Sequence, residues 1–155
     1  MSIVSQDNPI RVFASHAFQE HDDYNRLFEY LESTTNFFYA NSAVPDKVPE
    51  EDTEEALKDE LREQIEPAEI VIILAGLYDE FHEWIDFTLL VAKSSDKPVI
   101  VIEHFGGTQE IAPEIAKIAD EVVSWNERSM VDAIRRQARH EETQRWDVIE
   151  FDMPE

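Results

Sequence analysis

The 155-residue chain contains no cysteine, which excludes disulfides, thiolate nucleophiles, zinc–thiolate sites and iron–sulfur clusters. Glycine occurs only at Gly76, Gly106 and Gly107, so the sequence has neither a P-loop nor the spaced glycines of a dinucleotide-binding fingerprint. No apolar run approaches the ~18 residues of a membrane-spanning helix, and the N-terminus lacks a signal-peptide pattern. We therefore expect a cytoplasmic protein that meets no membrane.

Basic residues are also scarce, because 13 Lys and Arg oppose 35 Asp and Glu and give a formal net charge of −22 at pH 7. Nucleic acids and anionic membranes are bound through clustered basic side chains, so neither is an expected partner. The basic cluster Arg135, Arg136 and Arg139 is interpreted as a solvated turn at the C-terminus of a helix. The acidity indicates either adaptation to salt or a surface for a basic partner, and both interpretations stay open.

Two long apolar runs, residues 69–75 and 97–103, lack polar alternation, which is typical of strands buried on both faces of a parallel sheet. Three shorter segments complete the predicted strands, and the second of them suits a sheet edge: residues 11–15, 36–40 and 121–124. Helix-length segments separate the strands. This alternation predicts an α/β flavodoxin-like fold, with a three-layer, five-stranded parallel sheet of order 2-1-3-4-5 and helices on both faces.

Apolar side chains recur at helical spacing between these strands. We expect Asp22 or Asp23 to cap the first helix, and a capping box of Asp52 and Glu55 to start the second. The helix at residues 79–95 is apolar almost all round, so it should be buried against the sheet, with a second subunit as a further candidate cover. A short helix at residues 110–119 and a last helix around Met130, Val131, Ile134 and Ala138 complete the prediction.

The chain divides by sequence into an N-terminal extension (1–10), one α/β domain (11–142) and an acidic C-terminal segment (143–155). Residues 41–52 contain two prolines and several acids and are predicted to be an irregular flap beside the sheet. The C-terminal segment alternates apolar and acidic residues, which favours an extra edge strand over a docking tail.

In such sheets, ligands bind beyond the carboxyl ends of the strands. Eight candidate ligand-binding residues follow from that rule: Ser15, His16, Asn41, Gly76, Tyr78, His104, Trp125 and Asn126. The aromatic rings of Tyr78 and Trp125 could stack on a base or could cover the core. A phospho-receiver site is excluded, because it needs an acid pair and a phospho-accepting Asp where this chain has Ser15 with His16 and Ala75 with Gly76.

A metal site is not expected, although His16 and His21 lie near Asp22 and Asp23 in the sequence. Those residues lack the helical histidine pair of common zinc motifs, and capping of a helix explains the two aspartates. Ser15 and His16 are adjacent and point to opposite faces of a strand, so they do not form a nucleophile–base couple by themselves.

Four segments together, RVFAS at 11–15, IVIILAGLY at 70–78, AKSSDKP at 92–98 and EVVSWN at 121–126, resemble the small prokaryotic TIR-like domain family. That family includes the TIR-like protein of Thoeris anti-phage systems. The resemblance covers residues 11–139 and implies a signal-transduction module. In some members, it implies an enzyme that cleaves NAD and produces cyclic ADP-ribose.

The resemblance also implies where the catalytic glutamate of NAD-cleaving members would lie, four residues beyond a tryptophan on the helix after the third strand. Counting from Trp84 gives Thr88, which has no carboxylate. Glu83 and Asp86 are candidate substitutes, but on a helix they lie about 140° and 160° from Thr88. Trp84 is a candidate ligand contact and, alternatively, a core side chain.

Two hypotheses follow. The first is a TIR-like signalling and interaction module without NAD-cleaving activity, which acts through a protein partner or a homo-oligomer and binds a nucleotide at the strand ends. The second is an NAD-cleaving or cyclic ADP-ribose-producing enzyme that uses Ser15, Tyr78, Glu83 and Asp86. No resident cofactor is expected, and NAD enters only as a ligand or substrate.

Overall fold

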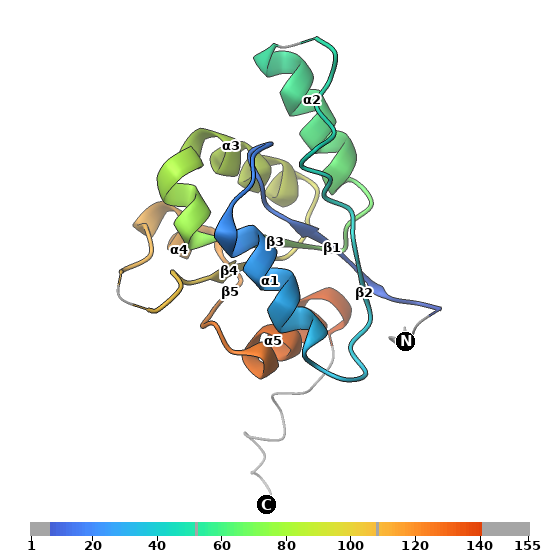
Figure 1. Ribbon diagram of the computed structural model, residues 1–155, viewed down its shortest axis with the longest axis vertical. Coiled ribbons are helices and arrows are strands. Elements are labelled where there is room, and N and C mark those ends of the chain that lie inside the picture. Colours follow the sequence, from blue (N-terminus) through green and yellow to red (C-terminus); the bar gives the residue numbers. More distant parts are fainter. Residues whose placement is uncertain (1–6, 52, 108, 141–155) are drawn as a thin grey trace, which may run out of the picture.

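A computed structural model describes residues 7–51, 53–107 and 109–140 (Figure 1). Strands and helices alternate along the chain: β1 (Ile10–Ala14), α1 (Asp22–Glu32), β2 (Tyr39–Asn41), α2 (Glu54–Ile65), β3 (Ile70–Leu74), α3 (Ala75–Ser94), β4 (Val99–Ile102), α4 (Pro113–Ile118), β5 (Glu121–Val123) and α5 (Glu127–Arg139). All strand pairs are parallel, and the five-stranded sheet has the order β2-β1-β3-β4-β5. The predicted flavodoxin-like α/β fold and its strand order are therefore confirmed.

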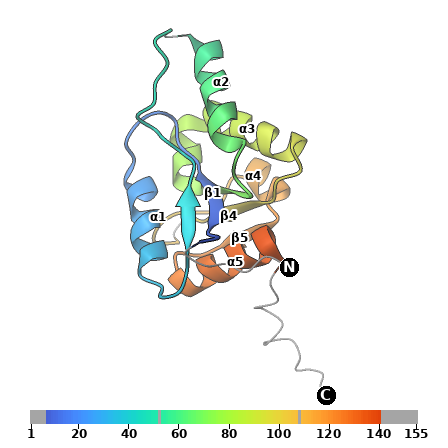
Figure 2. The ribbon, with the colours of Figure 1, turned by 90° about the vertical axis from the view of Figure 1, so that its right-hand side faces the viewer.

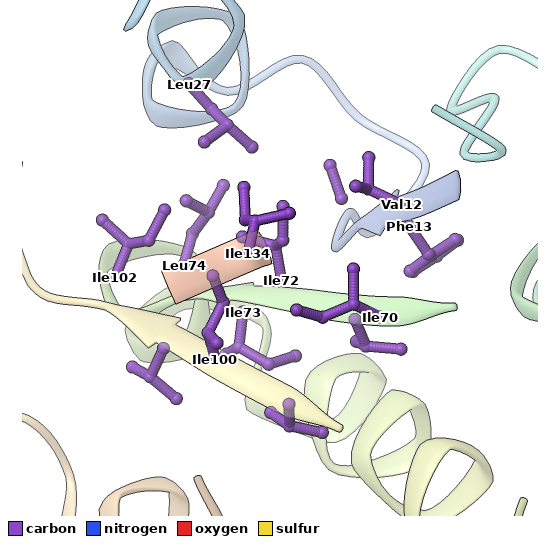
Figure 3. Close-up of a cluster of buried hydrophobic side chains, with 14 of the residues drawn as sticks. Val12, Phe13, Leu27, Ile70, Ile72, Ile73, Leu74, Ile100, Ile102 and Ile134 are labelled. Atoms are coloured by element: carbon purple, nitrogen blue, oxygen red, sulfur yellow. The ribbon is translucent and has the colours of Figure 1, made fainter. Parts of the chain in front are cut away.

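The central strands β3 and β4 are buried along their whole length, as continuous apolar runs predict. Helices α1 and α5 pack against each other, and α5 lies over β4 and β5, while α3 covers β3 and β4 with α2 at its side (Figure 2). Leu27 of α1 and Ile134 of α5 meet the side chains of the central strands in one core (Figure 3). The sheet therefore holds its strand ends rigidly between two helical layers.

The largest difference from the sequence prediction lies after β3. The strand ends at Leu74, and α3 begins at once with Ala75, so residues 76–78 lie in helical turns and not in a loop. Helical geometry is interrupted once, at Phe81 (φ −133°, ψ 45°). The apolar run could not show the boundary, because Leu77 and Tyr78 are buried in the helix just as Ile72 is buried in the strand.

Other boundaries shift less. The edge strand β2 covers Tyr39–Asn41 and not residues 36–40, because Asn36 has a φ of 62°, which an extended strand does not accommodate. The strands β4 and β5 and the short helix α4 lie inside their predicted ranges. The described residues 42–51 form neither helix nor strand, as predicted for this irregular segment.

The helix caps differ from the predictions. His21, and not Asp22 or Asp23, caps α1, because its ring Nδ1 accepts a hydrogen bond from the backbone N–H of Asp23 (3.1 Å). Thr53 caps α2 through its Oγ1, which accepts from the N–H of Ala56 (3.1 Å). Asp52, the other half of the predicted capping box, lies outside the described residues.

The helix α3 is less completely covered than its composition predicts. Leu90 is 65% exposed, whereas Ile85 and Leu89 are buried. Phe87 is buried because two cationic side chains of α2 lie over its ring, with Lys58 Nζ at 5.4 Å and Arg62 at 5.0 Å from the centroid. Cover by a second subunit therefore stays a prediction.

The basic cluster on α5 is not a solvated turn, which corrects the sequence interpretation. The side chain of Arg139 is only 6% exposed and donates to both carboxylate oxygens of Glu69. Arg136 binds the carboxylate of Glu121 through two nitrogens. These pairs tie α5 to the starts of β3 and β5. Burial tends to raise the pKa of Glu69, but hydrogen bonds from Arg139 and Arg11 outweigh it and lower the pKa to about 2.

The extra strand predicted within 143–155 lies outside the described residues, and the division into an extension, a domain and a tail stays a prediction. In the described ranges, none of the helices combines the length and apolar character required to cross a membrane.

Candidate functional site

A cleft of about 760 Å³ opens where β1, β3 and β4 end, between the start of α1 and the start of α3. This is the edge of the sheet at which ligands of flavodoxin-like folds bind. The cleft is lined by Glu20, His21, Asp22, Asp23, Arg26, Gly76, Asp79, Glu80, His104, Phe105 and Gln109.

His21 joins the two sides of the cleft. Its Nδ1 accepts from the N–H of Asp23 at the start of α1, so Nε2 carries the ring hydrogen and donates to Glu80 Oε2 on α3 (2.8 Å). One side chain therefore caps α1 and also fixes its distance from α3.

A glycine is required at the base of the cleft. A Cβ atom on Gly76 would clash with Asp23 Oδ2, so with any larger residue the Asp23 carboxylate would have to move from its present position. Asp23 also accepts from Arg26 Nη1 (2.6 Å), and the Arg26 guanidinium lies 3.9 Å from the centroid of the Phe105 ring. Arg26 therefore links Asp23, at the base of the cleft, to the ring of Phe105.

His104 lies on the opposite wall, and its Nε2 binds Asp79 Oδ2 at 2.7 Å. An ionised carboxylate only accepts hydrogen bonds, so Nε2 carries a hydrogen; in the neutral ring Nδ1 is then an acceptor. Within the residues that the structure describes, this Nδ1 is a buried atom without a hydrogen-bond partner.

Carboxylates dominate the electrostatics of the cleft. Five of its lining residues are acidic, namely Glu20, Asp22, Asp23, Asp79 and Glu80, and they face the single guanidinium of Arg26 and two histidine rings. The described residues contain no group of three or more His, Asp or Glu side chains placed to hold a metal ion. The arrangement favours ligands that donate hydrogen bonds over ligands that accept them.

Of the predicted ligand-binding residues, the structure brings only Gly76 and His104 into the cleft. Ser15 is fully buried, and its Oγ accepts from the N–H of Leu74 (3.3 Å). His16 is buried among aromatic rings and binds Gln64, and burial lowers its pKa below 6.5. These two side chains hold β1, β3 and α2 together and do not face the cleft lining.

Four other predicted residues also have internal partners. Asn41 accepts from the N–H of Ala14 and donates to the Tyr24 hydroxyl, and Asn126 caps α5. The Trp125 Nε1–H donates to the carbonyl of Glu103 (2.6 Å). Tyr78 is buried in α3, where burial and the neighbouring Asp86 raise its pKa to about 12.

The helix position implied by the TIR resemblance is also buried. Thr88 has no exposed surface, and its Oγ1 donates to the carbonyl of Trp84 (2.9 Å), one turn back on α3. Trp84 is half-buried against Phe18, while Glu83 and Asp86 are exposed. None of these four α3 residues lines the cleft.

Sequence reasoning missed the residues that give the cleft its character: Glu20, Arg26, Asp79, Glu80, Phe105 and Gln109. It treated His21, Asp22 and Asp23 only as metal ligands or caps. The available signal was closeness in sequence to the strand ends, because Asp79 and Glu80 lie within two helical turns of the end of β3 and Phe105 lies three residues beyond the end of β4. Because residues 76–78 were expected to form a loop, the helical turn that places Asp79 and Glu80 at the cleft was not predicted.

The fold and the cleft together define a flavodoxin-like α/β protein with a cleft at the ligand-binding edge of its sheet. The chain belongs to the family described as Thoeris protein ThsB, TIR-like domain, whose model matches residues 13–108. A search of curated proteins found no match. The protein is accordingly a TIR-like module of an anti-phage signalling type.

Proposed function

We propose that this protein is a TIR-like binding module that does not cleave NAD and that binds its ligand or partner at the strand-end cleft. The observation that carries the proposal is the state of Thr88, at the position where the family resemblance implies a catalytic glutamate. Its hydroxyl is fully buried and donates to a carbonyl of its own helix.

A threonine hydroxyl cannot replace the missing carboxylate. Its hydrogen is engaged by the Trp84 carbonyl, and the site is closed to solvent, so neither a substrate nor water reaches it. A carboxylate that stabilises a developing positive charge has to contact the reacting sugar. Thr88 supplies neither the charge nor the access.

The substitute acids of the alternative enzyme hypothesis have no supporting geometry. Glu83 and Asp86 are exposed and lie outside the cleft lining. Tyr78, with a pKa of about 12, is a poor proton donor at neutral pH, and the Ser15 hydroxyl is occupied by the N–H of Leu74. None of these four residues therefore has the arrangement that the enzyme hypothesis requires.

Two features support the cleft as the binding site. It lies beyond the carboxyl ends of the strands, where this fold class binds ligands, and it is the place where α1, α3 and the segment after β4 meet. A nucleotide ligand and a protein partner or homo-oligomer stay predictions. Phosphates of a nucleotide would be met by Arg26, whose guanidinium already binds Asp23.

The test is NAD consumption by the purified protein at high concentration, in low and high salt, with chromatographic detection of nicotinamide, ADP-ribose and cyclic ADP-ribose. We expect no product above a protein-free blank. Product that persists through repeated purification and disappears in Glu83→Gln or Asp86→Asn would overturn the proposal and establish a relocated catalytic acid.

A further inference from the structure

The loop between β1 and α1 (residues 15–21) is held by a histidine ring near each end. Near its start, His16 Nδ1 accepts a hydrogen bond from the N–H of Phe18 (3.1 Å), and at its end His21 caps α1. Among the described residues, the Phe18 N–H is the one backbone group of residues 17–20 with a hydrogen-bond partner. The conformation of this loop therefore depends on a ring nitrogen that can take up a proton.

The backbone of Phe18 is strained. Its φ of 60° lies in the left-handed region, which is unfavourable for a bulky side chain. The other described non-glycine residues with a positive φ are Asn, Asp or His, which enter this region more readily. Two kinds of contact hold Phe18 there: the hydrogen bond to His16, and edge-to-face packing of its ring against the rings of His16 (4.9 Å) and Trp84 (6.0 Å).

The hydrogen bonds around His16 fix which ring nitrogen carries the hydrogen. Gln64 Nε2 donates to the Val44 carbonyl and Gln64 Oε1 accepts from the Val44 N–H, so it is the amide oxygen that faces the His16 ring. His16 Nε2 therefore donates to Gln64 (2.8 Å), and Nδ1, which accepts from Phe18, carries no hydrogen. The contact with Phe18 requires the neutral ring.

The surroundings of His16 also favour the neutral ring. The residue is 1% exposed, and this burial lowers its pKa below 6.5, although the hydrogen bond with Gln64 and the charge of Glu60 act in the opposite direction. The Glu60 carboxylate on α2 accepts from Gln64 and lies 3.6 Å from Lys47 Nζ. On α1, the facing ionisable group is Tyr24, whose pKa burial raises, so it stays uncharged. No net attraction in this environment offsets the cost of burying an imidazolium.

We propose that the β1–α1 loop is an acid-sensitive element that opens when His16 takes up a proton from solvent at Nδ1. The protonated ring then presents an N–H to the N–H of Phe18, so that two donors face each other, whereas the hydrogen bond to Gln64 is kept. Phe18 loses its acceptor, leaves the left-handed conformation and moves its ring away from Trp84. Water then reaches the imidazolium and stabilises its charge.

Opening of the loop loosens one wall of the strand-end cleft, because Glu20 and His21 belong to the loop and line the cleft. Acid therefore acts on the same wall that a bound ligand or partner would contact. This regulation of the cleft rests on the proposed function, whereas the opening of the loop does not.

The test is hydrogen exchange at the Phe18 amide of the full chain, followed by NMR between pH 7.5 and 5.5 and corrected for the intrinsic effect of pH on exchange. If His16 has its ordinary pKa of 6.5 in the open loop, acid favours the open form by at most about tenfold over this range. We expect the protection of the Phe18 amide to fall several-fold, up to this limit. The exchange should be insensitive to low urea, because a local opening exposes little surface.

Two variants separate His16 from the other histidine of the loop. In His16→Asn, the side-chain oxygen can accept from the Phe18 N–H as in an Asx turn, but it does not titrate, so the pH dependence should disappear. His21→Asn keeps an N-cap for α1 and removes the titration of His21, so the response at Phe18 should persist. A pH dependence that survives in His16→Asn, or that is lost in His21→Asn, would overturn the proposal.

A further measurement needs no variant. Long-range ¹H–¹⁵N spectra of the His16 ring at pH 7.5 should show the hydrogen on Nε2, and a hydrogen on Nδ1 would contradict the proposal. So would protection of Phe18 that stays constant with pH, or exchange that rises with urea as steeply as at the Ile72 amide of β3, since that rise reports global unfolding. Nicotinamide release, which would overturn the proposed function, is measured in the separate turnover assay and leaves these outcomes unchanged.

Discussion

Single residues set the shape of the cleft, and Gly76 is the clearest case. It lies in the first turn of α3, where a Cβ atom would clash with Asp23 Oδ2. In an ordinary helix, replacing glycine by alanine stabilises the fold by about 1 kcal/mol. Here the clash opposes that gain, since the Asp23 carboxylate is held by Arg26.

We therefore expect Gly76→Ala to lower the free energy of unfolding by about 1–3 kcal/mol, as overpacking does. Urea denaturation measures it. In an Asp23→Ala background the same change should stabilise the protein by about 1 kcal/mol, because the obstacle is gone. A destabilisation of equal size in both backgrounds would show that Asp23 is not the cause.

His16 makes stability depend on pH. Burial lowers its pKa below 6.5, its value in an unfolded chain, so the folded protein favours the neutral ring. Above pH 6.5 this contribution to stability is fully present, and it is lost as pH falls through 6.5 towards the folded pKa, because the unfolded state then binds the proton. This pH range differs from that of Glu69. Because the pKa of Glu69 is about 2 in the folded protein, its contribution to stability is lost as pH falls from 4.5 to 2.

We expect the free energy of unfolding to decrease between pH 7.5 and 5.5 in the native chain and to decrease less in His16→Asn. Urea titrations at both pH values provide the measurement, and His82→Asn, at an exposed position, is the matched control. An unchanged pH slope in His16→Asn would contradict the assignment.

At the scale of an element, residue 88 of α3 is a packed core position, whereas the family resemblance implies a catalytic residue there. Thr88 is fully enclosed, so Thr88→Glu would bury a longer, charged side chain. We expect it to cost about 3 kcal/mol or more and to confer no NAD cleavage. Unfolding and product analysis measure the two effects.

Thr88→Ser is the control for this position, because it keeps the hydroxyl that donates to the Trp84 carbonyl. It should retain most of the stability. A stable Thr88→Glu variant that released nicotinamide would show that the helix can expose this position, and it would remove the structural argument against catalysis.

The segment after β2 is held by one side chain of α2. Gln64 Oε1 accepts from His16 Nε2 and from the Val44 N–H, both at 2.8 Å, and its Nε2 donates to the Val44 carbonyl and to Glu60. Gln64→Leu would remove the acceptor of the buried His16 Nε2–H and of the Val44 N–H. We expect a loss of about 2–4 kcal/mol and faster hydrogen exchange at the Val44 amide.

Hydrogen exchange followed by NMR measures this local effect, and Glu63→Leu on the exposed face of the same helix is the control. Exchange at Val44 that rises equally in both variants would mean that α2 as a whole, and not the Gln64 side chain, holds the segment.

At the scale of the whole molecule, the net charge of −22 acts on every state of the chain. Self-repulsion destabilises the compact state, and salt screens it, with a Debye length of about 10 Å at 0.1 M and 3 Å at 1 M. We expect the urea midpoint to rise with NaCl over this range. A variant with Glu55→Gln and Glu83→Gln, both exposed, should show a smaller rise.

Sucrose at matched osmolality is the control, because it strengthens burial without screening charge. A midpoint that rises as much in sucrose as in salt, with no difference between the native chain and the charge-reduced variant, would show that electrostatic repulsion does not limit stability.

The order of the strands followed from the sequence alone. The runs at residues 69–75 and 97–103 are long, apolar and without alternation, and this pattern is typical of strands that are covered on both faces. Helix-length spacers then leave right-handed crossovers as the simplest connection. The missing glutamate at Thr88 was likewise visible in the sequence, because helical spacing from Trp84 is a local property.

Only the tertiary structure decided the cleft. His21 meets Glu80 across 59 positions of sequence, and His104 meets Asp79 across 25. Periodicity reports which face of an element is buried, but not which elements approach closely enough for two side chains to bond. At the cleft, the His21–Glu80 hydrogen bond links α1 to α3, and Gly76, which has no Cβ atom, leaves room there for the Asp23 carboxylate.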